Sequence, residues 1–242
     1  TFDYEGKGLP YNEWEIRLKV AIKADGSFKN KYKPFDCYIN IKEKRKKERL
    51  EWLLNNNNIK YEILDGVEGY SVYKFTYLDN EKTYTKEWYN CTKEQYKIIY
   101  DEIFYWDGDF KYKDRFFTTI KSDADFIQFV GTSLGYRCSI QIKDRTGQIN
   151  KIKSNNKSYI RKSIDYVVNF TKRTLISLCS DSREDHTKTP ITKYKTLDGY
   201  KYCFTVPSGM LVLRRNNCIF ITGNCGKTAS TKALLDMLDE YN

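Results

Sequence analysis

Two aspartates follow apolar, helix-forming stretches and precede a glycine. Asp25 follows WEIRLKVAIKA (residues 14–24), and Asp107 follows TKEQYKIIYDEIFYW (residues 92–106). Carboxylates at the ends of two helices packed side by side can share divalent metal ions, which activate water and stabilise the leaving oxygen of a phosphodiester. Mg²⁺ prefers such hard oxygen ligands. On spacing alone, two ordinary helix-terminating Asp-Gly turns are the commoner source of this pattern.

Asn224 and Cys225 form a second pair with chemical potential. An asparagine side-chain amide can attack its own backbone carbonyl to form a succinimide, which breaks the following peptide bond. A cysteine directly after that bond is a good nucleophile, because thiols ionise readily and form thioesters. Taken alone, an Asn-Cys pair is equally compatible with an exposed turn.

The residues after this pair match the end of a phosphate-binding loop. In such a loop Lys227 would reach the phosphates and Thr228 would ligate Mg²⁺. The complete loop needs a glycine five residues before Gly226, and the sequence has Ile221 there. The loop is therefore incomplete as it stands, and an insertion that interrupts a host ATPase would explain the gap. A helix from Ala229 would face the phosphates with its N-terminus.

The composition favours a folded protein with an anionic partner. The 242 residues carry a net charge of +10 and are 40% hydrophobic, which allows one or two domains with a real core. No apolar run approaches the roughly 20 residues that a bilayer needs. The seven cysteines include no CxxC spacing, which argues for free thiols in a reducing compartment. We therefore expect a cytoplasmic protein with nucleic acid, and no membrane, as its partner.

The elements that must position the aspartates repeat with a period of about eighty residues, judged from the two Asp-Gly steps. Helix and strand patterns occur in the same order twice, and Ser122 and Gly135 would cap and end the last helix. The expected helices are 14–24, 42–58, 92–106 and 122–135, and the expected strands are 35–41, 59–64, 70–78, 115–120, 136–142 and 165–172.

The second expected helix begins with a strongly basic run, Lys42 to Arg49, which has six cations and two acids. Two interpretations remain open for this run. It is either a solvated helix face or a set of phosphate contacts along DNA, which would give affinity and salt dependence without reading sequence. Sequence reading would then come from sheet residues in the major groove.

Three segments together resemble LAGLIDADG (DOD-type) homing endonucleases. LKVAIKADGSF resembles the first dodecapeptide motif, IYDEIFYWDGDF the second, and FFTTIKSDADFIQFVGTSLGYRCSI the segment after it. The resemblance covers about residues 10–171 and implies an α+β fold of two αββαββ halves, whose motif helices form the interface and whose curved sheets straddle double-stranded DNA. It also implies Asp25 and Asp107 as catalytic, Mg²⁺-binding acids and Lys121 as a lysine near the scissile phosphate. Tyr105 and Trp106 depart from the small residues of an ideal motif, which would loosen or tilt the helix pair.

The segment YKYCFTVPSGMLVLRRNNCIFITGNC resembles the C-terminal splicing blocks of phage-type inteins, over about residues 192–225. The resemblance implies β-strands of a Hint (intein) splicing domain. Cys225 would accept the upstream flank by transthioesterification, and Asn224 would then cyclise and release the intein. Gly223, Cys203 and Met210 stand where many inteins have histidine, aspartate and histidine, so acid–base help would come from other groups.

The Cys-led and TxxH blocks of an intein are absent from this sequence. Either a separate N-terminal intein fragment supplies them, as in a split intein, or the sequence, which begins with Thr1, starts within a longer chain. We expect three parts: a DOD-type homing endonuclease in residues 1–180, a linker and splicing segment in 181–224, and the start of a host P-loop ATPase or helicase in 225–242.

The expected function is site-specific double-strand DNA cleavage combined with C-terminal protein splicing. Two alternatives remain open. One is a catalytically inactive DNA-binding relic of the same fold, which metal-dependent nicking of DNA would distinguish. The other is a P-loop ATPase fragment in which residues 1–224 form an ordinary domain, which nucleotide binding would distinguish.

Overall fold

The computed structural model describes residues 4–28, 32–151, 158–172, 178–179, 189–190, 197–200, 206–207 and 209–223. The chain divides into two units, Thr1–Lys172 and Arg173–Asn242, and each is described by itself. None of the helices in the described residues is long and apolar enough to cross a membrane.

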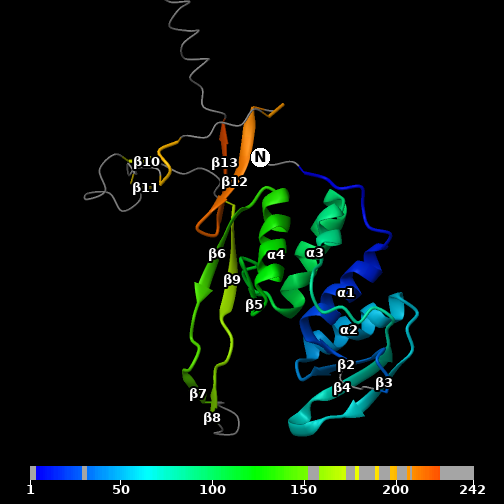
Figure 1. Cartoon of the computed structure of the whole chain (residues 1–242). Coiled ribbons are helices and arrows are strands. Elements are labelled where there is room, and N and C mark those ends of the chain that lie inside the picture. The colour runs from blue at the N-terminus through cyan, green and yellow to red at the C-terminus, as the bar shows by residue number, and fades with distance from the viewer. Residues whose placement is uncertain are drawn as a thin grey trace, which may run out of the picture. The chain divides into compact units, whose positions relative to one another are not determined.

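The first half of the first unit combines two helices with a four-stranded sheet (Figure 1). Its elements are α1 (Glu13–Asp25), β1 (Gly26–Ser27), β2 (Asp36–Ile41), α2 (Lys44–Asn56), β3 (Tyr61–Asp65), the 3₁₀ turn η1 (Val67–Gly69) and β4 (Ser71–Thr76). The strand order is β1-β2-β4-β3, and all neighbours are antiparallel. In β2, Cys37, Ile39 and Ile41 are buried and alternate with more exposed residues, because one face of the strand covers the core.

The second half follows after a 3₁₀ turn, η2 (Lys86–Asn90). Its elements are α3 (Lys93–Trp106), β5 (Arg115–Thr118), α4 (Lys121–Ser133), β6 (Arg137–Lys143), β7 (Ile149–Lys151), β8 (Ser158–Ile160) and β9 (Asp165–Thr171). Both β5 and β6 pair antiparallel with β9. Gly108, directly after α3, forms an antiparallel bridge to Phe116 of β5.

The two halves therefore share one topology. A helix ends in an Asp-Gly step, the next residues pair with the first long strand, and that strand lies beside the last strand of its half. The expected repeat of helices and strands is confirmed for these residues. In Figure 1 the four helices pack together, with the sheet of the second half on the left and the sheet of the first half at the lower right.

The helices α1 and α3 begin in the same way. Asn12 caps α1 in a capping box with Glu15, and Thr92 caps α3 in a capping box with Gln95. The Gln95 side chain also accepts from the Leu9 N–H (2.9 Å) and donates to the Leu9 carbonyl (2.8 Å). The start of α3 is thus tied to the segment that leads into α1.

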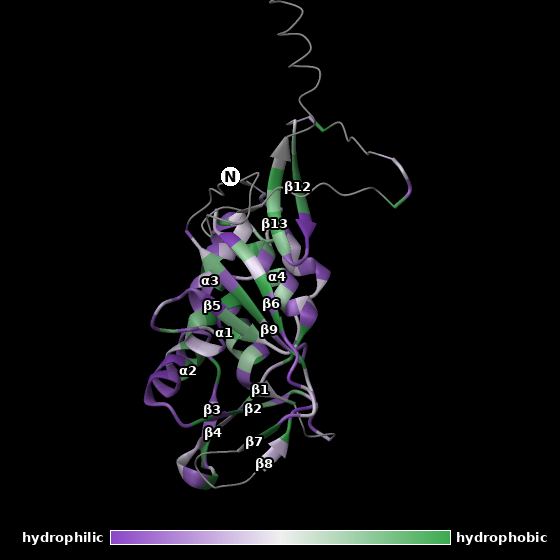
Figure 2. Cartoon of the chain, turned by 90° about the vertical axis from the view of Figure 1, so that its left-hand side faces the viewer, coloured by the Kyte–Doolittle hydropathy of each residue, from purple (hydrophilic) through white to green (hydrophobic). Residues whose placement is uncertain are grey.

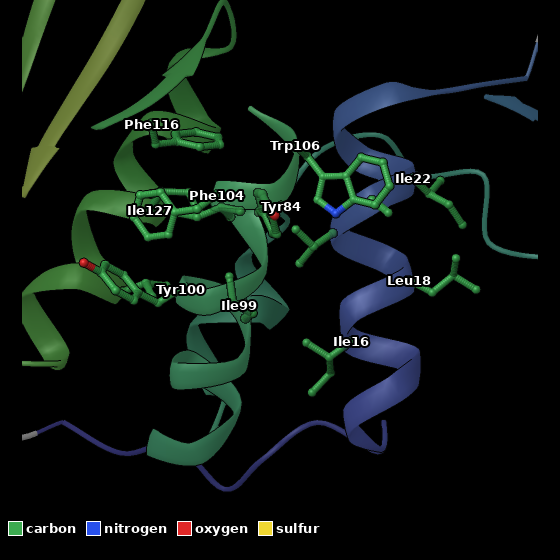
Figure 3. Close-up of a cluster of buried hydrophobic side chains, with 14 of the residues drawn as sticks. Ile16, Leu18, Ile22, Tyr84, Ile99, Tyr100, Phe104, Trp106, Phe116 and Ile127 are labelled. Carbon is green, nitrogen blue, oxygen red and sulfur yellow. The ribbon is translucent and has the colours of Figure 1, made fainter. Parts of the chain in front are cut away.

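Apolar side chains fill the space between α1 and α3. Figure 3 shows Ile16 of α1 and Ile99 of α3 between the two helices, with Trp106 at the end of α3 lying against α1. Ala21 is fully buried in α1, and its small side chain fits the close packing expected of a motif helix. Trp106 is 5% exposed, so this bulky side chain at the end of the second motif is buried in the core.

A buried carboxylate joins three of the helices. Glu102 of α3 is completely buried and forms ion pairs with Arg17 of α1, at 3.0 Å, and with Arg49 of α2. It also accepts a hydrogen bond from Trp106 Nε1 at 2.9 Å. Because a buried charge is costly unless it is paired, this network requires α1, α2 and α3 to be assembled together.

Two details differ from the sequence expectations. Ser122 lies inside α4 rather than capping it, because the Ile120 carbonyl accepts from the Ala124 N–H (3.1 Å) and so begins the helical bonding two residues earlier. The hairpin of β7 and β8 was not expected, since its residues lack a regular apolar alternation. Gly135 ends α4 in the left-handed region, at φ +87°, as expected.

The second unit contains short strands in its described residues. The strand β10 (Leu178–Cys179) pairs parallel with β11 (Thr189–Pro190), and β12 (Met210–Arg215) forms an antiparallel hairpin with β13 (Cys218–Gly223). The hairpin turn is Asn216–Asn217, with both φ angles positive, at 49° and 61°. Asparagine tolerates this conformation, which suits the twist of a two-residue hairpin loop. This hairpin lies within the segment that resembles splicing blocks, and its assignment to a Hint domain stays a prediction.

Candidate active site at the ends of the paired helices

The structure places Asp25 and Asp107 at equivalent positions. Asp25 is the last residue of α1, and Asp107 is the C-cap of α3. The glycine after each aspartate is required by close contact with the preceding turn. A Cβ at Gly26 would lie 2.6 Å from the Ile22 carbonyl oxygen, and a Cβ at Gly108 would lie 2.6 Å from Phe104 Cδ1. Both Asp-Gly steps therefore fold tightly onto the last turn of their own helix, with the Gly26 N–H donating to the Ile22 carbonyl and the Gly108 N–H to the Ile103 carbonyl.

The charge of Asp25 acts on the carboxyl group of Asp107. Burial, followed by the charge of Asp25, raises the pKa of Asp107 to about 6, while Lys46 and Lys82 act in the opposite direction. Asp25 itself forms an ion pair with Lys46, with 2.8 Å between Nζ and Oδ2. Two lysines that the motif does not contain, Lys46 and Lys82, therefore lie near these carboxylates.

Lys82 comes from the segment that links the two halves. Its ammonium donates to the carbonyl oxygens of Ile22 (2.7 Å) and Gly26 (2.5 Å), which lie on either side of Asp25 in sequence. These carbonyls belong to the end of α1, where the helix dipole favours a cation. Burial lowers the pKa of Lys82, and the charges of Asp107 and Asp25 oppose that shift.

Lys23 of α1 also binds this linking segment. Its ammonium donates to the carbonyl oxygens of Glu81 (3.0 Å) and Thr83 (2.6 Å), the neighbours of Lys82. It also lies over the rings of Tyr84 and Trp88 at 5.4 and 5.2 Å. Burial lowers the pKa of Lys23 to about 8.

A cavity of about 450 Å³ opens beside Asp107. It contains cations from both halves, aromatic rings and three carboxylates. The lining residues are Val20, Lys23, Ala24, Lys82, Tyr84, Ile103, Trp106, Asp107, Phe116, Phe117, Thr118, Thr119, Ile120, Asp123, Lys143, Arg145, Arg161, Asp165 and Val167. Five of these carry positive charge and three negative, so the cavity suits an anionic group next to the Asp107 carboxylate.

Asp123 is the third residue of α4 and adds a second acid to this cavity. Its Oδ1 accepts the Tyr84 N–H at 3.0 Å, which fixes the linking segment once more. Burial raises the pKa of Asp123, and the Tyr84 N–H and the nearby Lys23 oppose that rise.

Lys121 is placed differently from the two aspartates. It lies at the start of α4, where it forms an ion pair with Asp125, and it is not among the residues that line the cavity. Its role near a scissile phosphate stays a prediction.

The basic run of α2 divides into two groups. Arg45 donates to the Tyr105 carbonyl (2.9 Å), Lys46 pairs with Asp25, and Arg49 pairs with Glu102, so these three side chains bind the neighbouring helices. Lys44, in contrast, is 90% exposed. Figure 2 shows α2 as predominantly hydrophilic, although half of its basic run serves internal packing. Neither of the two interpretations of this run covers the whole of it.

The splicing and phosphate-loop residues lie outside the described residues. These are Asn224, Cys225, Lys227 and Thr228, together with Cys203 and the expected helix from Ala229. The structure describes the two other departures: Met210 begins β12 and Gly223 ends β13.

Sequence reasoning missed four residues that surround the carboxylates: Lys23, Lys46, Lys82 and Asp123. A signal existed for Lys23, because a lysine two residues before Asp25 interrupts an otherwise apolar helix end. Lys82 gave no such signal, since its partners lie 56 and 60 residues away in the sequence.

The residues present fit a divalent ion. Asp25 and Asp107 at the two helix ends supply carboxylate oxygens, the hard donors that such ions prefer, and the charge of Asp25 acts on Asp107. No group of three or more His, Cys, Asp or Glu side chains in the described residues is arranged to hold a metal. An ion at Asp25 and Asp107 would therefore complete its coordination with water and phosphate oxygens.

No protein-family model and no curated protein matches the chain. Among solved structures, mesophilic variants of the homing endonuclease I-DmoI are 17% identical with a TM-score of 0.44, and the match covers 66% of this chain and 88% of that chain. I-DmoI in complex with DNA and Mn is 17% identical with a TM-score of 0.43, covering 66% and 91%. Full-length DUF199/WhiA from Thermatoga maritima is 8% identical with a TM-score of 0.42, covering 66% and 53%. These solved structures are of a homing endonuclease and of a protein whose N-terminal domain is described as a LAGLIDADG domain.

Proposed function

We propose that residues 4–172 form a site-specific, metal-dependent DNA endonuclease. The observation that carries this proposal is the juxtaposition of two Asp-Gly helix ends with a cavity that is lined by five cationic and three acidic side chains. Two carboxylates that share a divalent ion are a recurrent solution for phosphodiester hydrolysis. The cations beside them supply the attraction for DNA phosphates that such a reaction needs.

Each residue has a distinct part in this proposal. In the complex with DNA, where phosphate oxygens add ligands, Asp25 and Asp107 would hold Mg²⁺, which when bound supplies Lewis-acid activation of water and of the phosphate. Lys82 would stabilise the negative charge of the phosphate from the linking segment, because its ammonium lines the cavity beside Asp107 and two backbone carbonyls hold it in place. Arg145 and Arg161, both paired with Asp165, would hold a neighbouring DNA phosphate at the cavity mouth.

The test is cleavage of a randomised duplex DNA library with Mg²⁺, followed by sequencing of the new ends. A single recurring site should emerge, and Asp25→Asn or Asp107→Asn should abolish cutting and leave salt-dependent DNA binding largely intact. Binding without any metal-dependent nicking would favour the inactive relic. Unchanged cutting by both variants would remove these carboxylates from the reaction.

A second function is proposed for the other unit. The hairpin of β12 and β13 ends at Gly223, directly before Asn224, and it exposes apolar side chains from both strands. The large ones are Met210, Val212, Leu213, Phe220 and Ile221. A hairpin of this kind needs further strands to cover it. An N-terminal intein fragment that carries the missing Cys-led and TxxH blocks would supply them and bring its cysteine to Cys225.

In this proposal Asn224 cyclises and Cys225 holds the upstream flank as a thioester. The ATP-binding role of Lys227 and Thr228 would arise after ligation restores the host loop, and it stays a prediction.

A further inference from the structure

The shared topology of the two halves makes Lys46 and Asp123 counterparts. Both α2 and α4 follow the first long strand of their half, and Lys46 and Asp123 are each the third residue of their helix. Both side chains act on the carboxylates at the helix ends. The first half therefore presents an ammonium where the second half presents a carboxylate, so the two sides of the site differ in charge.

Lys46 already forms an ion pair with Asp25, the aspartate at the helix end of its own half. Its Nζ lies 2.8 Å from Asp25 Oδ2, and the two side chains are 17% and 27% exposed. The ammonium also lies 5.7 Å from the centre of the Trp106 ring. Water screens such a partly buried pair less than a surface pair, so the contact is held firmly.

Lysines already accompany the carboxylates near the helix ends. Asp25, Asp107 and Asp123 lie near the ammonium groups of Lys23, Lys46 and Lys82, and Glu81 adds a further negative charge near Asp123. Two divalent ions would add four positive charges to this set. An ion bound at Asp25 would also displace Lys46 and leave a partly buried ammonium unpaired, which is costly.

We propose that Lys46 takes the place of one of two divalent ions, so that the free protein binds a single ion, on the Asp107 side. This inference rests on the proposed endonuclease function and concerns the metal content of the same site. The ammonium performs at Asp25 the neutralisation that a second ion would otherwise provide. The first half would then present an ammonium group to one DNA strand, and the second half would present a divalent ion to the other.

The experiment measures the number of Mn²⁺ ions bound per chain in the absence of DNA, by isothermal titration calorimetry and by electron paramagnetic resonance. The wild-type chain should bind one ion, and Lys46→Gln should bind two. Lys46→Arg keeps the positive charge and should still bind one. Lys44→Gln removes the same charge from an exposed position of the same helix and should also bind one.

The outcomes separate this inference from the proposed function. If Asp107→Asn leaves Mn²⁺ binding unchanged, or if the wild-type chain binds none, the carboxylate pair is not the metal site and both proposals fail. If Asp107→Asn abolishes binding but Lys46→Gln gains no second ion, the role of Lys46 alone is wrong. Two ions on the wild-type chain would overturn it as well. The thermal midpoint of Lys46→Gln checks that it is folded, and Lys46→Met repeats the test with a side chain of similar length.

Discussion

Lys23 and Lys82 each donate hydrogen bonds to backbone carbonyls that lie close to the other lysine in the sequence. Lys23 donates to the carbonyls of Glu81 and Thr83, which flank Lys82, and Lys82 donates to the carbonyls of Ile22 and Gly26 around the end of α1. The segment between the two halves is thereby fastened to the helix end that carries Asp25. Neither lysine is available as a freely moving surface cation.

Lys82→Met should reduce DNA cleavage while largely preserving DNA binding. Removal of one positioned donor to a developing charge costs about a hundredfold in rate. Single-turnover cleavage with excess protein and an equilibrium binding titration measure the two effects. Lys86→Met is the matched control, because Lys86 is exposed on the same linking segment. Equal cleavage rates for the two variants would contradict the assignment of Lys82.

Asp107→Asn should stabilise the metal-free protein at neutral pH and not at acidic pH. The pKa of Asp107 is raised from 3.8 to about 6, so the folded state binds the proton more tightly than the unfolded state. This contribution to stability is complete below pH 3.8 and is lost as the pH rises through 6. Asparagine mimics the protonated form, and the gain above pH 7 should be on the order of 1–2 kcal/mol after solvent screening.

Thermal unfolding of wild-type and Asp107→Asn proteins at pH 3.5 and pH 7.5, with a chelator present, measures this difference. Asp65→Asn is the control, since Asp65 is an exposed carboxylate in β3. A benefit of Asp107→Asn that is as large at pH 3.5 as at pH 7.5 would show that the charge of Asp107 is not its cause.

Glu102→Gln should destabilise the fold strongly. The substitution leaves Arg17 and Arg49 facing a neutral group in a site where Glu102 is completely buried. Breaking a buried ion pair costs about 3–5 kcal/mol, whereas an exposed pair contributes about 0.3–0.5 kcal/mol. Urea unfolding of Glu102→Gln and of Glu48→Gln, whose exposed partner is Lys44, compares the two cases. Similar losses in both variants would mean that the Glu102 network does not join the helices.

Splicing should depend on two individual residues. Given an N-terminal fragment with the Cys-led block, the chain should ligate the upstream flank to Cys225 and lose residues 1–224. Asn224→Ala should stop this release and allow a branched thioester, and Cys225→Ala should stop ligation while permitting cleavage at either end. Mass spectrometry identifies the products, and a spliced product from Asn224→Ala would assign the release step to another residue.

Local signals in the sequence accounted for the elements but not for their long-range contacts. Asn12 with Glu15 and Thr92 with Gln95 are complete capping boxes within four residues, so the starts of both motif helices could be anticipated. The Asn-Asn turn of the second unit is similarly local. Ser122 was placed wrongly because a serine before acidic residues resembles a cap even when the helix begins earlier.

The charged residues around the site could not be placed from sequence. A run such as Lys42 to Arg49 has the composition of a solvated helix face, and its inward contacts depend on acids that other helices supply. Arg49 meets Glu102 across 53 residues of sequence, and Lys46 meets Asp25 across 21. No periodicity within a helix encodes such a partner.

The buried Glu102 network also restricts how the two halves could be exchanged between proteins. Glu102 comes from the second half, and its partners Arg17 and Arg49 come from the first. A chimera that joined this second half to a foreign first half without both arginines would bury an uncompensated charge. Only a first half that supplies both guanidinium groups should therefore combine with this second half into a stable protein.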